Sequence, residues 1–295
     1  MYNAVAHNKR NTVLIFIVFF IIIGGGLAWL ANYVYGGWSL SVMVLVIVAI
    51  YMVIQYFSAG RVAISVSGGK EVSRENNSEL IGMIQALSVN YGIPEPRIFI
   101  VDDPSPNAFA TGRNPKNAMI AVTTGLLEKL DRREVMAVLA HEMSHVKNYD
   151  ILVSVVVFGL VAAIGMIGDF VWRLSFTRGS RDSGPVMMVF GLVGLILAPI
   201  VAALVRLALS RQREYLADAS SVLTTRDFNG LILALERIRD TGGPLIRQNT
   251  STEYLWFSST LKEGSIFQRL FSTHPPINKR IERLRELNSE KASKM

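Results

Sequence analysis

Long apolar runs without charge alternate with charged segments along this chain, and they give the first indication of its architecture. No charged residue occurs between Arg10 and Arg61, a stretch long enough for two helices of the roughly 20 residues that a bilayer requires. We expect one apolar helix over Val13 to Ala31 and a second over Trp38 to Phe57. The joint from Asn32 to Trp38 holds aromatic residues suited to the membrane interface and glycines that can turn the chain. The pattern predicts an N-terminal transmembrane hairpin.

A second pair of uncharged runs lies in the middle of the chain, over Ile151 to Gly168 and Ser183 to Val205. Both are close to the length of a membrane span, so they predict a second hairpin. The loop expected between them carries Asp169, Arg173, Arg178, Arg181 and Asp182.

Each hairpin has an alternative interpretation. The first apolar run could be a signal peptide cleaved near Ala31, but a second apolar run follows at once, which argues for a hairpin. The run from Ile151 to Gly168 is near the lower length limit of a span. A tilted or partly buried re-entrant helix is therefore also consistent with it.

The segment from Arg61 to Asp150 has the mixed composition of a water-soluble domain. Capping residues at Asn76, Asn77 and Ser78 predict a helix from Ser78 to Tyr91. Strands are predicted over three β-branched or apolar stretches, namely Arg97 to Val101, Asn107 to Thr111 and Ala118 to Thr123.

Beyond Arg206 the pattern again indicates soluble helices. They are expected through Ala219, from Asp227 to Arg239, and from Pro275 to Leu287 with Thr273 as the cap and the prolines in the first turn. The tail from Asn288 to the C-terminus is expected to be disordered.

Together these elements predict a mainly α protein with a small β-sheet, in the α+β class, in which a membrane hairpin divides a soluble domain in two. The predicted parts are an N-terminal hairpin over residues 1–60, the first half of the soluble domain over 61–150, the second hairpin over 151–205, and the second half over 206–295.

Composition mainly excludes some kinds of site. Hydrophobic residues make up 51% of the chain, charged residues 18%, and the mean hydropathy is +0.35, which fits a protein partly in a bilayer and partly in water. The net charge of +7 would suit nucleic acid, but many basic residues flank the apolar runs, which favours an anionic membrane surface and no nucleic-acid partner. Because there is no cysteine, any metal must be held by histidines and carboxylates.

The strongest chemical motif lies on a helix with a predicted capping box, Asp131 followed three residues later by Glu134. His141 and His145 then lie at i and i+4 on one helix face, about 6 Å apart, within reach of one zinc ion. Glu142 is rotated by about 100° from that pair and can face a water molecule at the metal as a general base. The same five-residue spacing also occurs by chance, in which case both histidines would be ordinary residues of an amphipathic helix.

A catalytic zinc site needs a third protein ligand and an open position. The other histidines are His7 and His274, so a carboxylate is a natural candidate. Glu214 and Asp218 share one face of a predicted helix; Glu214 could bind zinc, and Asp218 could accept the ring N–H of a ligand histidine. Glu214 could also be a surface carboxylate beside neighbouring arginines. The ligand interpretation is favoured because a hairpin of two spans returns the chain to the side that it left.

This ordered set of features resembles the HtpX family of membrane zinc endopeptidases, bacterial relatives of the CAAX prenyl proteases. The resemblance extends over most of the chain. It rests on the two hairpins, Asn107 to Gly112, His141 to His145, Glu214 to Asp218, and His274-Pro275. It implies a gluzincin-like catalytic domain on the cytoplasmic side of the cell membrane and one zinc ion per chain. It also implies a stress-response role in quality control, the removal of damaged or misfolded membrane proteins.

The resemblance also implies a role for each matching residue. His141, His145 and Glu214 would be the metal ligands, Glu142 the base and Asp218 the partner of His141.

Two further sets of residues take a role from the resemblance. His274 and Arg280 would stabilise negative charge near the scissile carbonyl; without the family they are a helix-cap histidine and a solvated arginine. An edge strand of Asn107, Ala108, Phe109 and Ala110 would pair with an extended substrate. Without the family these four residues are a short strand before a turn.

Two other functions are consistent with the sequence. A prenyl-protein protease would need a chamber for a lipidated peptide, which two hairpins do not readily enclose. A membrane scaffold or holdase would need only structural zinc, whereas Glu142 and an open coordination position are features that a structural site does not require. The expected partners are membrane-protein substrates and the lipid bilayer, and self-cleavage of the chain is a further hypothesis.

Overall fold

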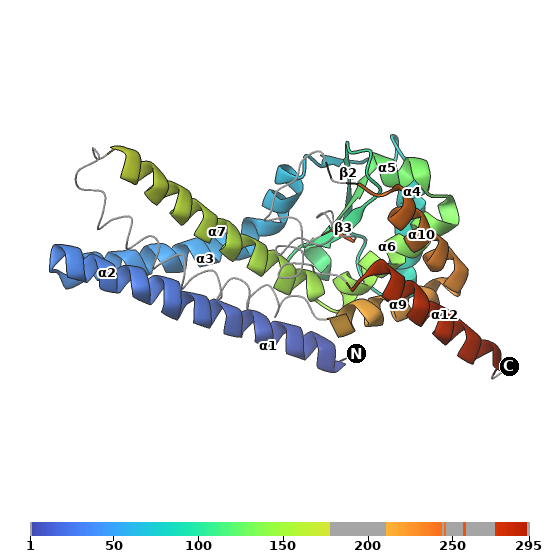
Figure 1. Ribbon diagram of the computed structural model, residues 1–295, viewed down its shortest axis with the longest axis horizontal. Helices are drawn as coiled ribbons and strands as arrows, with labels where there is room; N and C mark the ends of the chain where they lie inside the picture. Colours follow the sequence, from blue (N-terminus) through green and yellow to red (C-terminus); the bar gives the residue numbers. More distant parts are fainter. Residues whose placement is uncertain (1, 178–210, 244, 246–255, 258–274, 294–295) are drawn as a thin grey trace.

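The computed structural model describes residues 2–177, 211–243, 245, 256–257 and 275–293. They form two parts, an elongated bundle of apolar helices and a globular unit at one end of it (Figure 1). The predicted span from Ser183 to Val205 lies outside the described residues, as do Thr273, His274 and the predicted loop residues Arg178, Arg181 and Asp182.

The bundle begins with α1 (Tyr2–Phe19), a π-helical turn (Phe20–Gly24) and α2 (Gly25–Tyr35), followed by α3 (Trp38–Val66). Val5–Tyr33 and Trp38–Val66 are each long and apolar enough to cross a membrane, as the uncharged pattern predicted. The predicted joint from residue 32 to 38 was too long, because only two glycines separate the helices. Gly36 ends α2 with φ +67°, a conformation that glycine adopts without strain.

The third long helix of the bundle is α7 (Asp150–Thr177). It corrects the predicted loop, because Asp169 and Arg173 belong to the helix. The helix continues through these two charges because its backbone hydrogen bonds do not depend on side-chain polarity, whereas the predicted boundary was drawn from the loss of apolar residues. An 80° bend separates α7 from the preceding helix, α6 (Arg132–Lys147).

The globular unit contains a four-stranded sheet in the order β1-β2-β4-β3, formed by β1 (Lys70–Glu71), β2 (Arg97–Val101), β3 (Ala108–Thr111) and β4 (Met119–Thr123). β2 and β4 are parallel, and both outer pairs are antiparallel. The three longer strands confirm the prediction. Strand β1 was missed, since a two-residue strand has no periodicity to detect.

Both faces of the sheet are covered. Ile98, Ala108 and Ile120 belong to the core of the globular unit, whereas their neighbours Phe99 and Phe109 belong to a second core beneath the long helices. Because successive side chains of a strand point to opposite faces and each face has its own core, every residue of β3 and β4 is buried.

Helices complete the globular unit on the first of these cores (Figure 1). Their bounds are α4 (Ser78–Tyr91), α5 (Thr124–Lys129), α6, α9 (Arg211–Thr225), α10 (Phe228–Thr241) and α12 (Ile277–Ser293), with a 3-10 turn over Pro115–Asn117.

The structure confirms α4 as predicted and corrects the ends of two later helices. α9 continues beyond Ala219, and α12 begins after the prolines and extends to Ser293, so the predicted disordered tail is mostly helical. Polar residues such as Glu and Lys have good helix propensity, which the tail prediction undervalued. The predicted division of the chain into four parts stays a prediction; α3 continues across its boundary at residue 60.

Candidate metal centre

The metal motif lies on α6, whose start is fixed by the predicted capping box. The Asp131 side chain accepts the N–H of Glu134, and the Glu134 carboxylate accepts the N–H of Asp131, both at 2.9 Å. α6 packs against α4, α9, α10 and β3, so it is the central helix of the globular unit. Its His141 and Glu142 are buried, with 0% and 4% of their surface exposed.

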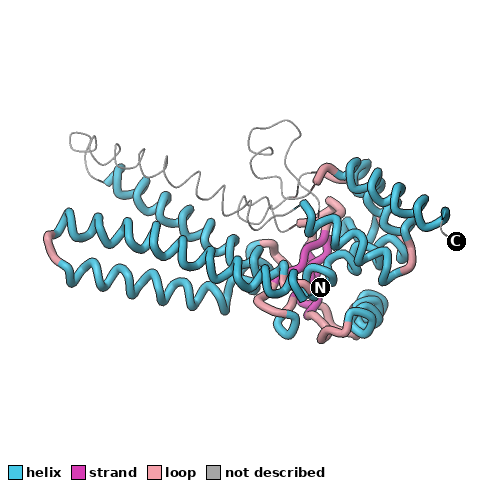
Figure 2. Tube along the Cα trace, turned by 90° about the horizontal axis from the view of Figure 1, so that it is seen from below, coloured by secondary structure: helices cyan, strands magenta, loops and turns pink. Residues whose placement is uncertain are grey.

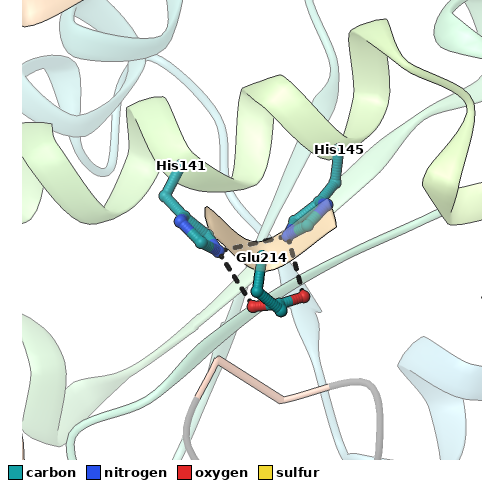
Figure 3. Close-up of side chains that lie close together, drawn as sticks. All are labelled: His141, His145 and Glu214. Carbon is teal, nitrogen blue, oxygen red and sulfur yellow. Dashed lines mark hydrogen bonds and ion pairs between the residues drawn. The ribbon is translucent and has the colours of Figure 1, made fainter. Parts of the chain in front are cut away.

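Three potential ligands converge on one point. His141 and His145 extend from α6, and Glu214 from α9 places its carboxylate opposite both rings (Figure 3). The two Nε2 atoms are 3.1 Å apart, and the Glu214 oxygens lie 3.6 Å from His141 Nε2 and 3.5 Å from His145 Nε2. Within the described residues these three ligand atoms all lie within 4.8 Å of one another.

This geometry fits zinc. Zn–N and Zn–O bonds of about 2.0–2.1 Å in a tetrahedron place ligand atoms about 3.3 Å apart. The Nε2–Nε2 separation of 3.1 Å is close to that value, and each Nε2 has a Glu214 oxygen at a similar distance, Oε2 at 3.6 Å from His141 and Oε1 at 3.5 Å from His145. Two imidazoles and one carboxylate also form a donor set typical of catalytic zinc, leaving one position for water or substrate.

The other ring nitrogen of His141 is held by a buried ion pair. Its Nδ1 lies 2.9 Å from Asp218 Oδ1, as expected of a residue that fixes the tautomer of a ligand. The fully buried guanidinium of Arg280 donates to both Asp218 oxygens, at 2.9 and 2.6 Å. Burial alone would raise the pKa of Asp218, but Arg280 and His141 together hold it at about 2. Asp218 therefore stays ionised and leaves His141 Nε2 free for the metal.

His145 has an equivalent partner that the sequence analysis missed. Its Nδ1 lies 2.9 Å from Oδ2 of Asp150, the first residue of α7. The position of Asp150 directly before a long apolar run could have marked it as a candidate partner in the sequence. Its contact with His145, however, depends on the bend between α6 and α7, where Tyr149 has φ +61°.

The carboxylates around the ligands make the site attractive to a cation. Burial alone would lower the pKa of His145, but Glu214, Asp150 and Glu142 raise it to about 9 in the metal-free chain. The same carboxylates would stabilise a divalent ion bound in place of this proton.

Arg280 occupies a different environment from that of a solvated helix residue. Its guanidinium lies over the Phe257 ring, 4.4 Å from the centroid, and Nη2 is 3.3 Å from His141 Nδ1. Arg280 thus lies behind His141 and is bound to Asp218. The predicted role at the scissile carbonyl, shared with His274, stays a prediction because His274 lies outside the described residues.

Strand β3 is the outer strand of the sheet, as predicted for residues 107–110. Among the described residues, Trp256 and Phe257 contact this outer edge. The N–H of Phe257 donates to the Ala108 carbonyl at 2.7 Å, and the Trp256 ring packs edge-on against Phe109. The Phe257 ring also contacts His141, with centroids 4.9 Å apart. The edge strand and the metal ligands therefore share a neighbour.

The chain matches a known protein family and named relatives over most of its length. Residues 74–288 match the sequence profile of the family described as "Peptidase family M48". The chain is 48% identical to a protein named "Protease HtpX homolog" from Tropheryma whipplei (strain TW08/27), over 98% of this chain and 99% of that protein. Another "Protease HtpX homolog", from Streptococcus gordonii, is 41% identical over 97% of this chain and 100% of its own length.

A solved structure resembles the fold as a whole. The crystal structure of S. mikatae Ste24p superposes with a TM-score of 0.50 at 19% identity. The match covers 92% of this chain, which spans 65% of the Ste24p chain. At this identity the likeness concerns the fold alone.

Proposed function

The chain belongs to peptidase family M48, and from this premise we propose that it is a zinc-dependent endopeptidase acting on damaged or misfolded membrane proteins at the cytoplasmic face of the cell membrane. Metalloprotease activity follows from the family and its protease relatives. The identity of the metal, the substrate class and the orientation in the membrane are the proposal. The observation that carries it is the convergence of His141, His145 and Glu214 at the separations of zinc ligands.

The proposed site divides the chemistry among a few side chains. His141 and His145 would hold zinc through Nε2, and Glu214 through its carboxylate. Asp218 and Asp150 would keep the proton of each ring on Nδ1. When bound, zinc supplies Lewis acidity, which polarises the scissile carbonyl and lowers the pKa of water.

Glu142 is the proposed general base. Its carboxylate takes a proton from the attacking water as the new C–O bond forms, and it passes that proton to the amide nitrogen as the C–N bond breaks. Glu142 directly follows His141 on α6 and is 4% exposed, so its carboxylate lies in the same buried surroundings as the proposed ligands.

Substrate is proposed to bind as an added strand on β3. An extended peptide along Asn107 to Ala110 would use the backbone groups that a sheet edge offers. The carbonyl of Ala108 already accepts the Phe257 N–H, so a substrate pairing there would replace that bond. The apolar helices would restrict the enzyme to the bilayer, where loops of unfolded membrane proteins come within reach.

The decisive experiment compares the detergent-purified wild type with Glu142→Gln on an unfolded protein, after chelation and after zinc is added back. We expect hydrolysis only by zinc-loaded wild type, a rate loss of about 10²–10⁴-fold in Glu142→Gln, and one zinc per chain in both. Glu128→Gln, at an exposed glutamate of α5, is the matched control and should keep wild-type activity.

Other outcomes would select the alternatives. One bound zinc without hydrolysis by either protein would favour a scaffold with structural zinc. Cleavage confined to a prenylated peptide would favour a prenyl-protein protease. Equal hydrolysis by wild type and Glu142→Gln would assign the activity to a contaminant.

Self-cleavage is a separate part of the proposal. An endopeptidase that accepts unfolded segments can cut its own exposed loops, so zinc-loaded wild type should fragment during storage while Glu142→Gln stays intact. A wild-type chain that remains intact with zinc would contradict it.

A further inference from the structure

The helix α1, the first membrane helix, contacts the globular unit through its polar N-terminal end. In two perpendicular views the N-terminal end of α1 lies beside that unit, while the turn between α2 and α3 lies at the far end of the bundle (Figures 1 and 2). Asn8 is in this end of α1, and only 1% of its surface is exposed. A buried amide is costly unless it is hydrogen-bonded, so its partners indicate its role.

The Asn8 side chain makes three hydrogen bonds near the proposed metal ligands: both of its N–H groups donate, and its oxygen accepts once. Nδ2 donates to Asp150 Oδ1 at 2.7 Å and to the Asn148 carbonyl at 2.9 Å, and Oδ1 accepts from Arg213 Nη1 at 3.2 Å. A helix that served only as an anchor would need no such group at this position.

These bonds connect Asn8 to residues beside two of the proposed metal ligands, His145 and Glu214. Asp150 receives Asn8 on one carboxylate oxygen and His145 Nδ1 on the other. Arg213, which also lies 3.5 Å from Asp150 Oδ1, directly precedes Glu214 on α9. One side chain of α1 thus connects the helices that carry His145 and Glu214.

Asn8 also fastens the bend between α6 and α7. Asn148 is the residue that ends α6, and its carbonyl, beyond the last helical turn, takes the Asn8 amide as partner. The next residue of α1, Lys9, places its ammonium 4.6 Å from the centroid of the Tyr149 ring. The bend sets where Asp150 starts α7, and hence where its carboxylate lies relative to His145.

We propose that Asn8 is a positioning residue of the metal centre, through which the first membrane helix orients Asp150 and His145 and so sets the affinity for zinc. This inference rests on the proposed zinc site. It assigns α1 a part in forming that site, in addition to spanning the membrane.

The test measures metal binding by the full-length, detergent-purified chain. Asn8→Leu removes the amide while keeping the same number and branching of side-chain heavy atoms, Asn8→Gln keeps an amide, and Thr12→Val is the matched control. Thr12 is buried one turn along α1, and its hydroxyl donates to the Asn8 backbone carbonyl. Zinc affinity is measured against a chromophoric chelator, and the absorption of the cobalt-substituted protein reports ligand geometry.

We expect Asn8→Leu to weaken zinc binding by about tenfold, the lower end of the effect of losing a partner of a ligand, and to shift the cobalt spectrum. Asn8→Gln should recover part of the affinity, and Thr12→Val should match wild type. If Asn8→Leu does not fold, Asn8→Gln and Asn8→Ser are judged by the same two measurements.

Wild-type zinc affinity and an unchanged cobalt spectrum in the Asn8 variants would overturn the inference, as would an equal loss in Thr12→Val. Failure of the proposed function is distinguishable, because a wild-type chain that bound no zinc would refute the zinc site itself. A wild-type chain that bound zinc without hydrolysis would refute the peptidase and still allow Asn8 to be judged.

Discussion

Buried charges around His141 show how single residues combine stability with function. Arg280 and Asp218 are both buried, and each offsets the cost of removing the other from water. Asp218 also accepts the Nδ1–H of His141, so the ion pair keeps a proton acceptor ionised inside the core. Asp218 thus has a structural contact with Arg280 and a proposed metal-orienting contact with His141, and mutagenesis can separate the two.

Replacing Asp218 with Asn should therefore have two effects. It leaves the Arg280 guanidinium buried without its counter-charge, a loss of about 3–5 kcal/mol in unfolding free energy. It also removes the carboxylate that fixes His141, which should weaken zinc binding about 10–100-fold. Thermal unfolding and chelator competition measure the two separately.

The double variant Asp218→Asn with Arg280→Met is the control for the prediction on Asp218. Removing both charges should restore most of the stability, while zinc binding stays weak. If zinc affinity recovered with stability, Asp218 would act on the metal only through the integrity of the fold.

At the scale of elements, the two ends of α6 are stabilised differently. The first end is stabilised within the helix, since Asp131 and Glu134 satisfy each other's backbone N–H groups within one turn. Its other end depends on α1, through the Asn8 amide on the Asn148 carbonyl. The two ends should respond differently to mutation.

Asp131→Ala should reduce the unfolding free energy by about 1 kcal/mol, the usual cost of losing an N-terminal cap. Zinc affinity should not change, because the ligands lie two turns or more along the helix. Asp131→Ser, which keeps a capping oxygen, should retain most of the stability. A fall in zinc affinity for Asp131→Ala would show that the start of α6 influences the ligands after all.

At the scale of the whole molecule, the bundle and the globular unit meet at the candidate metal site. The polar end of α1, the bend between α6 and α7, and the ligands lie together at one end of the bundle, while the Gly36-Gly37 turn lies at the other (Figure 1). Since Val5–Tyr33 and Trp38–Val66 are each long enough to cross a membrane, this arrangement predicts opposite sides of the membrane for the turn and the site.

Introduced cysteines can test the orientation without background, because the natural chain contains none. Ser39→Cys, next to the turn, should react with an impermeant maleimide in intact bacterial cells. Ser289→Cys, exposed on α12, should react only after permeabilisation if the globular unit is cytoplasmic. Labelling of Ser289→Cys in intact cells would place the site outside.

Local patterns in the sequence were sufficient to predict most of the elements and to single out His141, His145 and Glu214 as candidate ligands. Each of these patterns lies within a short segment: the apolar runs of bilayer length, the capping box of α6, and the two i, i+4 pairs His141/His145 and Glu214/Asp218. Such patterns depend on helix periodicity and on the chemistry of neighbouring residues. Helix ends were less accurate, because Asp169, Arg173 and the polar tail continue helices that their polarity argued against.

Only the tertiary structure decided what surrounds the ligands. Asn8, Asp150 and Arg280 come from separate helices, and their contacts depend on the bend at Tyr149 and on the packing of α1 and α12. Periodicity in one segment carries no information about which distant polar group will satisfy another. Burial imposes that choice, because each polar group removed from water must find its partner within the fold.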